Sequence, residues 1–340
     1  MRTLVTGAAG FMGSHLVDAL LELNHEVYAV DDLSGGYIEN VNPKSKFKKL
    51  DLRETKETAD YIDEIKPELV FHLAADAALG RSQFIPISST QRNLLAYLNL
   101  LVPAIRNGMK KMVLTSSMDV YGDQTSPFSE EMDLKPEDIY GISKAAMEEV
   151  THALAKVHKY DYVIIRPHNV YGPRQNMADP YRNVIAIFIN CLLNNKNFYV
   201  YGDGEQKRAF SFIDDFTPYI LKAGFDDKVN GEVFNIGPCQ ETTINNLANI
   251  VLEQFFDGKE IPENLKPKHV PPRPLEVKEA WCTVDKAEKL LDYKTTVSLE
   301  EGIKKMIEWA RIKGPQQFKY SENYELDSDK IPSTWKEKLI

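Results

Sequence analysis

Short apolar runs alternate with segments of helical apolar spacing through the first half of the chain. Runs typical of strands fall at residues 4–6, 26–30, 46–50, 68–73, 111–115 and 161–166. Helical spacing covers residues 11–23, 54–65, 88–107 and 141–159. Regular alternation of strands and helices is typical of a parallel sheet with helices on both faces. The predicted fold class is therefore α/β, with a doubly wound parallel sheet.

The pattern loosens beyond about residue 170, where loops bearing Gly and Pro separate the helices. Helical spacing recurs near residues 182–194, 214–223, 243–256, 285–291 and 299–312. We therefore expect a first domain over residues 1–170, a smaller α/β lobe mainly over 171–314, and a tail at 315–340. Later segments are expected to interleave with the first domain. The tail carries Trp335 and a charged tract, and both a docked and a disordered tail fit this pattern.

Three glycines lie in the turn between the first predicted strand and the first predicted helix. Gly7, Gly10 and Gly13 allow a tight turn, a close approach of the backbone to a pyrophosphate, and close strand–helix packing. The free N–H groups and the dipole at the start of that helix favour anions. The spacing is GxxGxxG rather than GxGxxG. The segment predicts a dinucleotide-binding turn.

The second predicted strand ends in two acidic residues, Asp31 and Asp32. An acid at this place suits the adenosine ribose hydroxyls and repels a 2′-phosphate, which favours NAD over NADP. Gly7, Asp31, Ala74 and Ser117 all follow predicted strands. Ligands of open parallel sheets collect at the carboxyl ends of the strands, so these residues are expected to line one crevice.

Tyr140 and Lys144 form a YxxxK pair that lies 23 residues after Ser117. On a helix their side chains share one face. The Lys ammonium is expected to lower the phenol pKa from about 10 towards neutrality, because a nearby opposite charge favours the phenolate. A base that titrates near the working pH suits hydride chemistry on an alcohol.

The bulk composition excludes several function classes. With 340 residues, 43% of them hydrophobic, 27% charged and a net charge of −9, the chain is typical of a soluble globular protein. It has no long basic stretch, so no nucleic-acid partner is expected. Its three cysteines are scattered without metal-ligand spacing, which favours a reducing cytoplasm and predicts no metal site. No apolar run approaches the ~18 residues of a membrane span, and no signal peptide precedes the first strand.

Further motifs follow in order along residues 2–313. They are Asp51-Leu52-Arg53, His72-Leu73-Ala74-Ala75, Thr115-Ser116-Ser117 with Val120-Tyr121-Gly122, Arg166-Pro167 with Asn169-Val170-Tyr171-Gly172-Pro173, Gly202-Asp203-Gly204 through Arg208, and Arg273-Pro274. Together they resemble the extended short-chain dehydrogenase/reductase family, and within it the NAD-dependent nucleotide-sugar epimerases and dehydratases. The resemblance implies a Rossmann-type NAD-binding first domain and a substrate-binding second lobe.

The resemblance also assigns candidate site residues. Those implied for NAD are Gly7, Gly10, Phe11, Met12, Gly13, Asp31, Asp32, Asp51, Leu52, Ala74, Ala75, Asn93, Ser116, Tyr140, Lys144 and Pro167. Those implied for substrate are Arg81, Ser117, Met118, Asp119, Asn169, Asn183, Arg208, Arg273 and Glu276. Arg208 and Arg273 suit a diphosphate, because a guanidinium matches phosphate oxygens in bidentate fashion.

The family chemistry implies a reaction sequence for these residues. A sugar hydroxyl carbon gives a hydride to NAD while its proton passes to Tyr140, with Ser117 and Lys144 assisting and Asp119 as a further catalytic candidate. A keto-sugar that turns over and accepts the hydride on its other face is epimerised, and NAD is regenerated. We expect C4 inversion of a UDP-hexose.

Alternatives remain open at this stage. The 4,6-dehydratases carry Asp-Glu where this chain has Met118-Asp119, and methionine cannot donate a proton. Decarboxylases of UDP-glucuronate carry Ser-Glu there, so Asp119 keeps a carboxylate one methylene shorter. A reductase with exchangeable NADPH and a non-catalytic NAD-binding regulatory protein are further alternatives. The family also implies a homodimer through the helices at 88–107 and 141–159.

Overall fold

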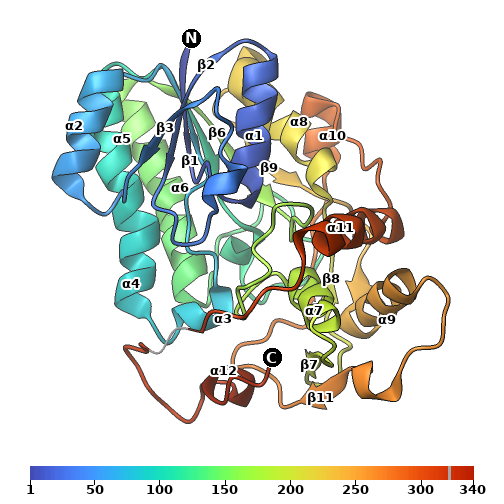
Figure 1. Cartoon of the computed structure of the whole chain (residues 1–340). Helices are drawn as coiled ribbons and strands as arrows, with labels where there is room; N and C mark the ends of the chain where they lie inside the picture. Colours follow the sequence, from blue (N-terminus) through green and yellow to red (C-terminus); the bar gives the residue numbers. More distant parts are fainter. Residues whose placement is uncertain (321–322) are drawn as a thin grey trace.

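The computed structural model describes residues 1–320 and 323–340, and the core of this described part is a seven-stranded parallel sheet (Figure 1). The strands lie in the order β3-β2-β1-β4-β5-β6-β9. Their bounds are β1 Arg2–Thr6, β2 Glu26–Asp31, β3 Lys46–Lys49, β4 Leu69–His72, β5 Lys111–Thr115, β6 Asp161–Pro167 and β9 Val233–Ile236. The strand order reverses between β1 and β4, which opens a crevice at their carboxyl ends.

Helices cover both faces of the sheet, as the alternating pattern predicts (Figure 1). One face carries α1 (Phe11–Glu22), α8 (Thr217–Phe225) and α10 (Asp285–Leu291). The other carries α2 (Thr55–Ile65), α5 (Ala96–Arg106) and α6 (Ile139–His158). A short α3 (Leu79–Ser82) and α4 (Pro86–Thr90) precede a π-helical turn at Gln91–Leu95 that runs into α5. The fold is therefore α/β and of the Rossmann type.

Successive residues of a central strand face opposite helical layers. On β4, Phe71 packs with the α1 side and Val70 with the α5 side, and both are fully buried. This burial on both faces explains why the central strands read as continuous apolar runs. The edge strand β3 instead carries three lysines around Phe47, and such charges discourage pairing with another chain.

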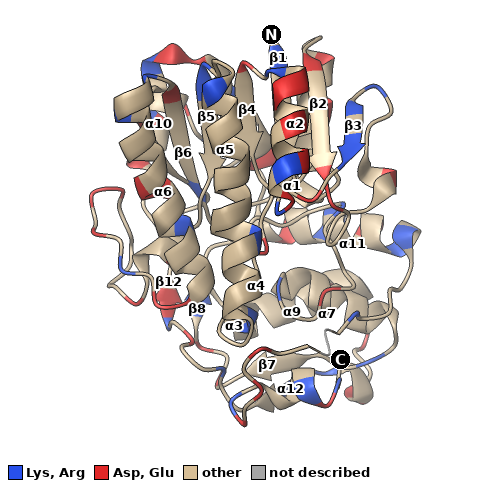
Figure 2. Cartoon of the chain, turned by 90° about the vertical axis from the view of Figure 1, so that its left-hand side faces the viewer, with Lys and Arg blue, Asp and Glu red and all other residues tan. Residues whose placement is uncertain are grey.

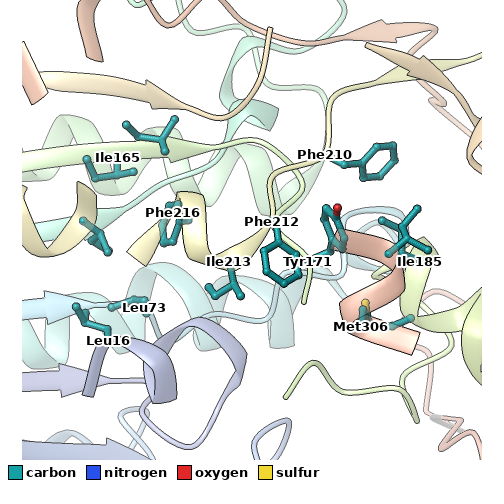
Figure 3. Packing of buried hydrophobic residues seen from close by; sticks show 14 of the residues in the cluster. Leu16, Leu73, Ile165, Tyr171, Ile185, Phe210, Phe212, Ile213, Phe216 and Met306 are labelled. Atoms are coloured by element: carbon teal, nitrogen blue, oxygen red, sulfur yellow. The ribbon is translucent and has the colours of Figure 1, made fainter. Parts of the chain in front are cut away.

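The smaller lobe stands at the carboxyl ends of the strands (Figure 1). Its helices are α7 (Val184–Leu193), α9 (Ile244–Phe256) and α11 (Leu299–Lys313). Short strands join them: β7 (Tyr199–Tyr201) pairs with β11 (Lys268–Val270), and β8 (Lys207–Arg208) pairs with β10 (Thr242–Thr243) and β12 (Glu279–Ala280). Figure 3 shows Ile213, Phe212 and Tyr171 between Leu16 of α1 and Met306 of α11, so the two lobes share one hydrophobic core.

Several elements differ from the sequence expectation. Strand β9, which the sequence did not predict, pairs with β6 in the main sheet. Helices α8 and α10 fall where helical spacing was expected, and they pack on the main sheet although they lie beyond residue 170. The short strands β7, β8 and β10–β12 were not predicted, because two or three residues give no periodicity. Residues 323–340 are docked rather than disordered, with α12 (Ser333–Lys336) holding Trp335 at 3% exposure. No helix in the described parts of the chain has the length and apolar character that a bilayer crossing requires.

A buried ion pair ties α6 to the centre of the sheet. Arg166 on β6 donates from Nε and Nη2 to the two carboxylate oxygens of Glu148 at 3.0 and 2.6 Å, and neither side chain is more than 4% exposed. Glu148 also accepts a hydrogen bond from Ser116 Oγ at the end of β5. Arg166 Nη1 donates to the Tyr121 hydroxyl at 2.7 Å, and this hydroxyl donates to Asn235 on β9 at 2.8 Å. The network therefore joins β5, β6, β9 and α6.

Removing one member of this pair is expected to destabilise the fold strongly. Glu148→Ala leaves the Arg166 charge buried without its partner, and we expect a loss of about 3–5 kcal/mol in the free energy of unfolding. Urea denaturation measures it. The matched control is Asp60→Ala, which breaks the exposed pair with Lys56 and should cost less than about 1 kcal/mol. Equal losses in the two variants would contradict the role assigned to Glu148.

Candidate active site

A cavity of about 360 Å³ lies between the carboxyl ends of the strands and the smaller lobe. Its walls include Phe11 and Met12 from the start of α1 and most of the residues that the sequence assigns to substrate. The latter are Ser117, Met118, Asp119, Asn169, Asn183, Arg208, Arg273 and Glu276, together with Tyr140 and Pro167. Residues that are far apart in the sequence therefore meet on one concave surface.

The glycine-rich turn leaves no room for side chains beside β4. Gly7 has φ +70°, and a Cβ there would lie 2.8 Å from the backbone nitrogen of Ala74. A Cβ on Gly13 would lie 2.1 Å from the Gly7 carbonyl oxygen. Helix α1 begins at Phe11 without a side-chain cap, so its first N–H groups are available to an anion. The turn has the geometry of a pyrophosphate cradle.

The two acids after the turn have different surroundings. The buried Asp31 carboxylate accepts hydrogen bonds from the backbone N–H of Ala9 at 3.0 Å and of Leu33 at 2.8 Å. Burial raises the pKa of Asp31 despite these bonds. Asp32 is more exposed; it accepts from the Ser34 N–H at 2.8 Å and lies 3.8 Å from Arg92 Nη1. Asp31 therefore fixes the glycine-rich turn to β2, and the ribose contacts of both acids stay predictions.

Asp51 and Leu52 follow β3. Asp51 accepts hydrogen bonds from Arg53 Nε at 3.0 Å and Nη2 at 2.5 Å, and this interaction lowers the pKa of Asp51. Leu52 is buried in the core on the α5 side. Ala74 and Ala75 follow β4, where the Ala74 N–H donates to Thr6 Oγ1 at 3.2 Å.

Two residues that the sequence assigns to the cofactor use their side chains inside the protein. Ser116 Oγ donates to Glu148. Asn93 is fully buried; its Oδ1 accepts from the Asp76 N–H at 3.1 Å, and its Nδ2 donates to the carbonyls of Asp76 and Ser89 at 3.2 and 2.9 Å. Both side chains therefore position the ends of strands, and their direct contact with NAD stays a prediction.

Ser117, Tyr140 and Lys144 converge at the end of β5. Ser117 caps a 3₁₀ turn at Met118–Tyr121, and its Oγ donates to Asp119 Oδ2 at 2.7 Å. Tyr140 lies in the first turn of α6, whose N-cap Asp138 accepts from the Tyr140 N–H at 2.9 Å. Lys144 Nζ donates to the Thr115 carbonyl at 2.7 Å and lies 5.8 Å from the centroid of the Tyr140 ring.

The prediction that the pKa of the Tyr140 phenol is lowered towards neutrality is wrong for the protein without a bound cofactor. Burial raises the pKa of the Tyr140 phenol above its usual value, and the carboxylates of Asp119 and Asp138 raise it further. Burial also lowers the pKa of Lys144 to about 8, although Glu148 opposes that shift. The isolated site therefore holds Tyr140 as a neutral phenol, because desolvation and the two carboxylates outweigh the Ser117 hydrogen bond and the charge of Arg182, which favour the phenolate.

Asp119 is the acid with the most perturbed environment on this wall. Burial and the nearby Asp138 raise the pKa of Asp119 to about 7, while the Ser117 hydrogen bond and Arg208 oppose the shift. A carboxyl group that titrates near neutrality can exchange a proton at working pH. Because Asp119 accepts a hydrogen bond from Ser117, it is placed to act on a ligand group that Ser117 contacts.

Two arginines of the cavity wall share one carboxylate. Arg273 donates from Nε and Nη2 to Glu276 at 2.6 and 2.9 Å. Arg208 Nη2 lies 3.3 Å from Glu276 Oε1 and donates to the Val277 carbonyl at 2.6 Å. Burial alone would raise the pKa of Glu276, but the two arginines lower it. The trio carries one net positive charge, which suits an anionic ligand.

The structure corrects one substrate residue and adds another. Arg81 does not belong to the cavity wall; its guanidinium lies 4.8 Å from the centroid of the Tyr181 ring. Arg182 lines the cavity instead, paired with Asp179 at 2.5 Å and lying 3.9 Å from Asp76. The charge of Arg182 also favours the ionised form of Tyr140. The only sequence signal for Arg182 was its position directly before Asn183.

Comparison with known proteins shows which proteins the chain is similar to. The profile of the NAD dependent epimerase/dehydratase family matches residues 3–237. A UDP-glucose 4-epimerase of Mycolicibacterium smegmatis is 36% identical, over 92% of this chain and 99% of that protein. A UDP-N-acetyl-alpha-D-glucosaminuronate decarboxylase of Bacillus cytotoxicus is 31% identical, over 91% and 98%. The crystal structure of Thermotoga maritima UDP-glucose 4-epimerase with UDP-glucose superposes with a TM-score of 0.84 at 34% identity, covering 92% of this chain and 99% of that one.

Proposed function

The chain belongs to the NAD dependent epimerase/dehydratase family, and we propose that it inverts C4 of a UDP-hexose through a transient keto-sugar. The observation that carries the proposal is the shared cavity. Ser117 and Tyr140 line it together with the cationic pair Arg208 and Arg273. A nucleotide sugar has the matching polarity, with a neutral sugar to be oxidised and a diphosphate to be held.

The residues around the glycine-rich turn fit NAD. The uncapped N-terminus of α1 and the crowded glycines Gly7 and Gly13 would hold the pyrophosphate, and Asp31 and Asp32 would face the adenosine ribose. Bound NAD supplies an acceptor for hydride and, in its oxidised form, a positive charge. A positive charge near a phenol favours the phenolate. Tyr140, neutral in the protein alone, would then act as the base.

Proton handling falls to residues on the β5 side. Tyr140 would take the proton of the sugar hydroxyl and return it after the sugar has turned. Ser117 Oγ, held by Asp119, would hydrogen-bond the reacting oxygen. Lys144 would keep its positive charge at pH values below its pKa of about 8. The arginines would keep the diphosphate fixed while the sugar rotates.

One observation favours a second reaction. Asp119 is half-buried, its pKa is raised to about 7, and it accepts a hydrogen bond from Ser117. A decarboxylase of a nucleotide-linked uronic acid is also among the similar proteins. A carboxylate at this place could assist loss of carbon dioxide from an oxidised uronate. Dehydration is disfavoured, because Met118 has no proton to donate.

Tyr140→Phe should abolish most turnover and leave the fold and NAD content intact, because only the acid–base hydroxyl is removed. We expect the rate to fall by roughly 10² to 10⁴. Steady-state kinetics measure the rate, and absorbance after desalting measures bound NAD. Tyr162→Phe, on β6 outside the cavity wall, is the matched control and should keep the wild-type rate. An unchanged rate in Tyr140→Phe would remove the phenol from the mechanism.

The product identifies the reaction. We expect the protein, without added cofactor, to convert UDP-glucose or UDP-N-acetylglucosamine into the C4-inverted sugar of unchanged mass, as followed by proton NMR. A pentose product and carbon dioxide from UDP-glucuronate would establish the decarboxylase, and Asp119→Asn should then lose that activity. Turnover only with added NADPH would indicate a reductase, and no product from any UDP-sugar would contradict the proposal.

We also propose that the protein is a cytoplasmic homodimer. Its cysteines Cys191, Cys239 and Cys282 are all free thiols, which suits a reducing compartment. The outer faces of α5 and α6 carry few charges (Figure 2) and expose apolar side chains. These are Leu95 just before α5, Val102 on it, and Ile142 and Val157 on α6, at 46–68% exposure. Paired with a second copy, the two helices would bury this surface.

A charge placed on that face should separate the subunits. Val102→Glu puts a carboxylate at a side chain that is 53% exposed on α5, and we expect a monomer by light scattering after size exclusion. Ile312→Glu on α11, at 89% exposure, is the matched control and should stay dimeric. A monomeric wild type, or a dimeric Val102→Glu variant, would contradict this interface.

A further inference from the structure

The C-terminal residues 315–340 lie outside the resemblance to the family, which ends at about residue 313. The similar proteins described above are covered over 98–99% of their length by only 91–92% of this chain. The segment is therefore an addition to a shared fold. Its described residues, 315–320 and 323–340, are nevertheless docked along one side of the molecule, and α12 lies below α3 and beside β7 (Figures 1 and 2).

Specific polar contacts hold the segment near its start and near its middle. Near its start, the Gln316 N–H donates to Asn190 Oδ1 at 2.9 Å, and Asn190 Nδ2 donates back to the Gln316 carbonyl at 3.0 Å. Further along, the Glu325 carboxylate accepts from the N–H groups of Ile87 and Ser88 at 2.7 and 2.9 Å. These hydrogen bonds determine the path that the segment takes over the protein surface.

Helix α12 brings this segment into the wall of the cavity. Thr334 and Trp335 line the cavity on the side of β7. The Trp335 ring is 3% exposed and packs edge-on against Tyr181, with centroids 5.3 Å apart. A Cβ on Gly80 would lie 3.2 Å from the Trp335 ring, so the small residue in α3 makes room for the indole.

A chain of contacts runs from α12 to the arginines. Thr334 Oγ1 and the Tyr201 hydroxyl share a hydrogen bond. The Arg273 guanidinium lies 4.8 Å from the centroid of the Tyr201 ring, in a cation–π contact. Arg273 in turn holds Glu276, which Arg208 also approaches. The position of Tyr201 therefore connects the added segment to the positive side of the cavity.

We propose that residues 323–340 are a substrate-binding element, in which Thr334 and Trp335 fix Tyr201, and through it Arg273, for the diphosphate of a nucleotide sugar. This inference rests on the proposed function and names the ligand group that the added segment serves. Thr334 is a positioning residue, because it acts through Tyr201. Trp335 itself forms part of the wall beside the bound nucleotide. A segment of purely structural value would affect stability without affecting nucleotide affinity.

The experiment compares full-length holoenzyme variants by calorimetric titration with UDP and by steady-state kinetics. Thr334→Val keeps the shape and removes the hydrogen bond, and we expect the Kd for UDP to rise about three- to tenfold. Trp335→Ala should raise it by about tenfold or more. The KM for the nucleotide sugar should rise in parallel while kcat changes by less than about twofold, because Ser117 and Tyr140 are untouched. NAD content should stay at the wild-type level.

Leu326→Ala is the matched control, since this apolar side chain of the same segment is 55% exposed. It should bind UDP as the wild type does. If Trp335→Ala prevents folding, Thr334→Val still tests the inference. Thermal melts check that both variants are folded. Wild-type UDP affinity in Thr334→Val and in a folded Trp335→Ala would overturn the inference.

The two proposals fail in different ways. A wild-type protein that binds UDP but converts no UDP-sugar would contradict the proposed reaction, and the affinities of the variants would still decide the role of the segment. A wild-type protein without affinity for UDP would overturn both proposals.

Discussion

The buried pair of Glu148 and Arg166 is the constraint on which the site depends. Tyr140, Lys144 and Glu148 are spaced by four residues on α6, so their side chains share one helix face. Glu148 is bound to β6 through Arg166 and to the end of β5 through Ser116. Since Ser116 directly precedes Ser117, the same carboxylate sets the rotation of α6 and the position of the β5 end. Serine and tyrosine are thereby aligned by one desolvated interaction.

The same desolvation governs the proton chemistry. Desolvation favours the neutral forms of the buried phenol, the buried ammonium and the half-buried carboxyl, and the pKa values of Tyr140, Lys144 and Asp119 shift accordingly. The YxxxK spacing therefore does not by itself make an acidic tyrosine. The site needs a further positive charge, and a cofactor that alternates between a cationic and a neutral ring would couple proton transfer to the redox state. With such a cofactor bound in its oxidised form, Tyr140 would be more easily ionised than in the protein alone.

Much of the cofactor half was predictable from the sequence, because its signals are local. The alternating pattern gave the strands up to β6, and the glycines between β1 and α1 mark a turn whose crowding is visible in Gly7 and Gly13. Strand β9 escaped prediction because it has four residues and an interior Asn235, which is buried through its bonds to Tyr121 and the Glu130 carboxylate. A polar residue within a short apolar run favours the prediction of a loop, because the sequence does not show the distant partners that satisfy its side chain.

The substrate half was less predictable, since its geometry depends on contacts between distant segments. The sequence assigned Arg81 and not Arg182 to the substrate, but Arg81 packs on Tyr181 while Arg182 lines the cavity. Trp335 reaches the cavity from beyond all family motifs, and no periodicity marks it. In this architecture the candidate catalytic side chains sit on local motifs at the strand ends, whereas the rest of the cavity wall is assembled by long-range packing. Changes of specificity can therefore arise in added or loosely patterned segments without disturbing the catalytic wall.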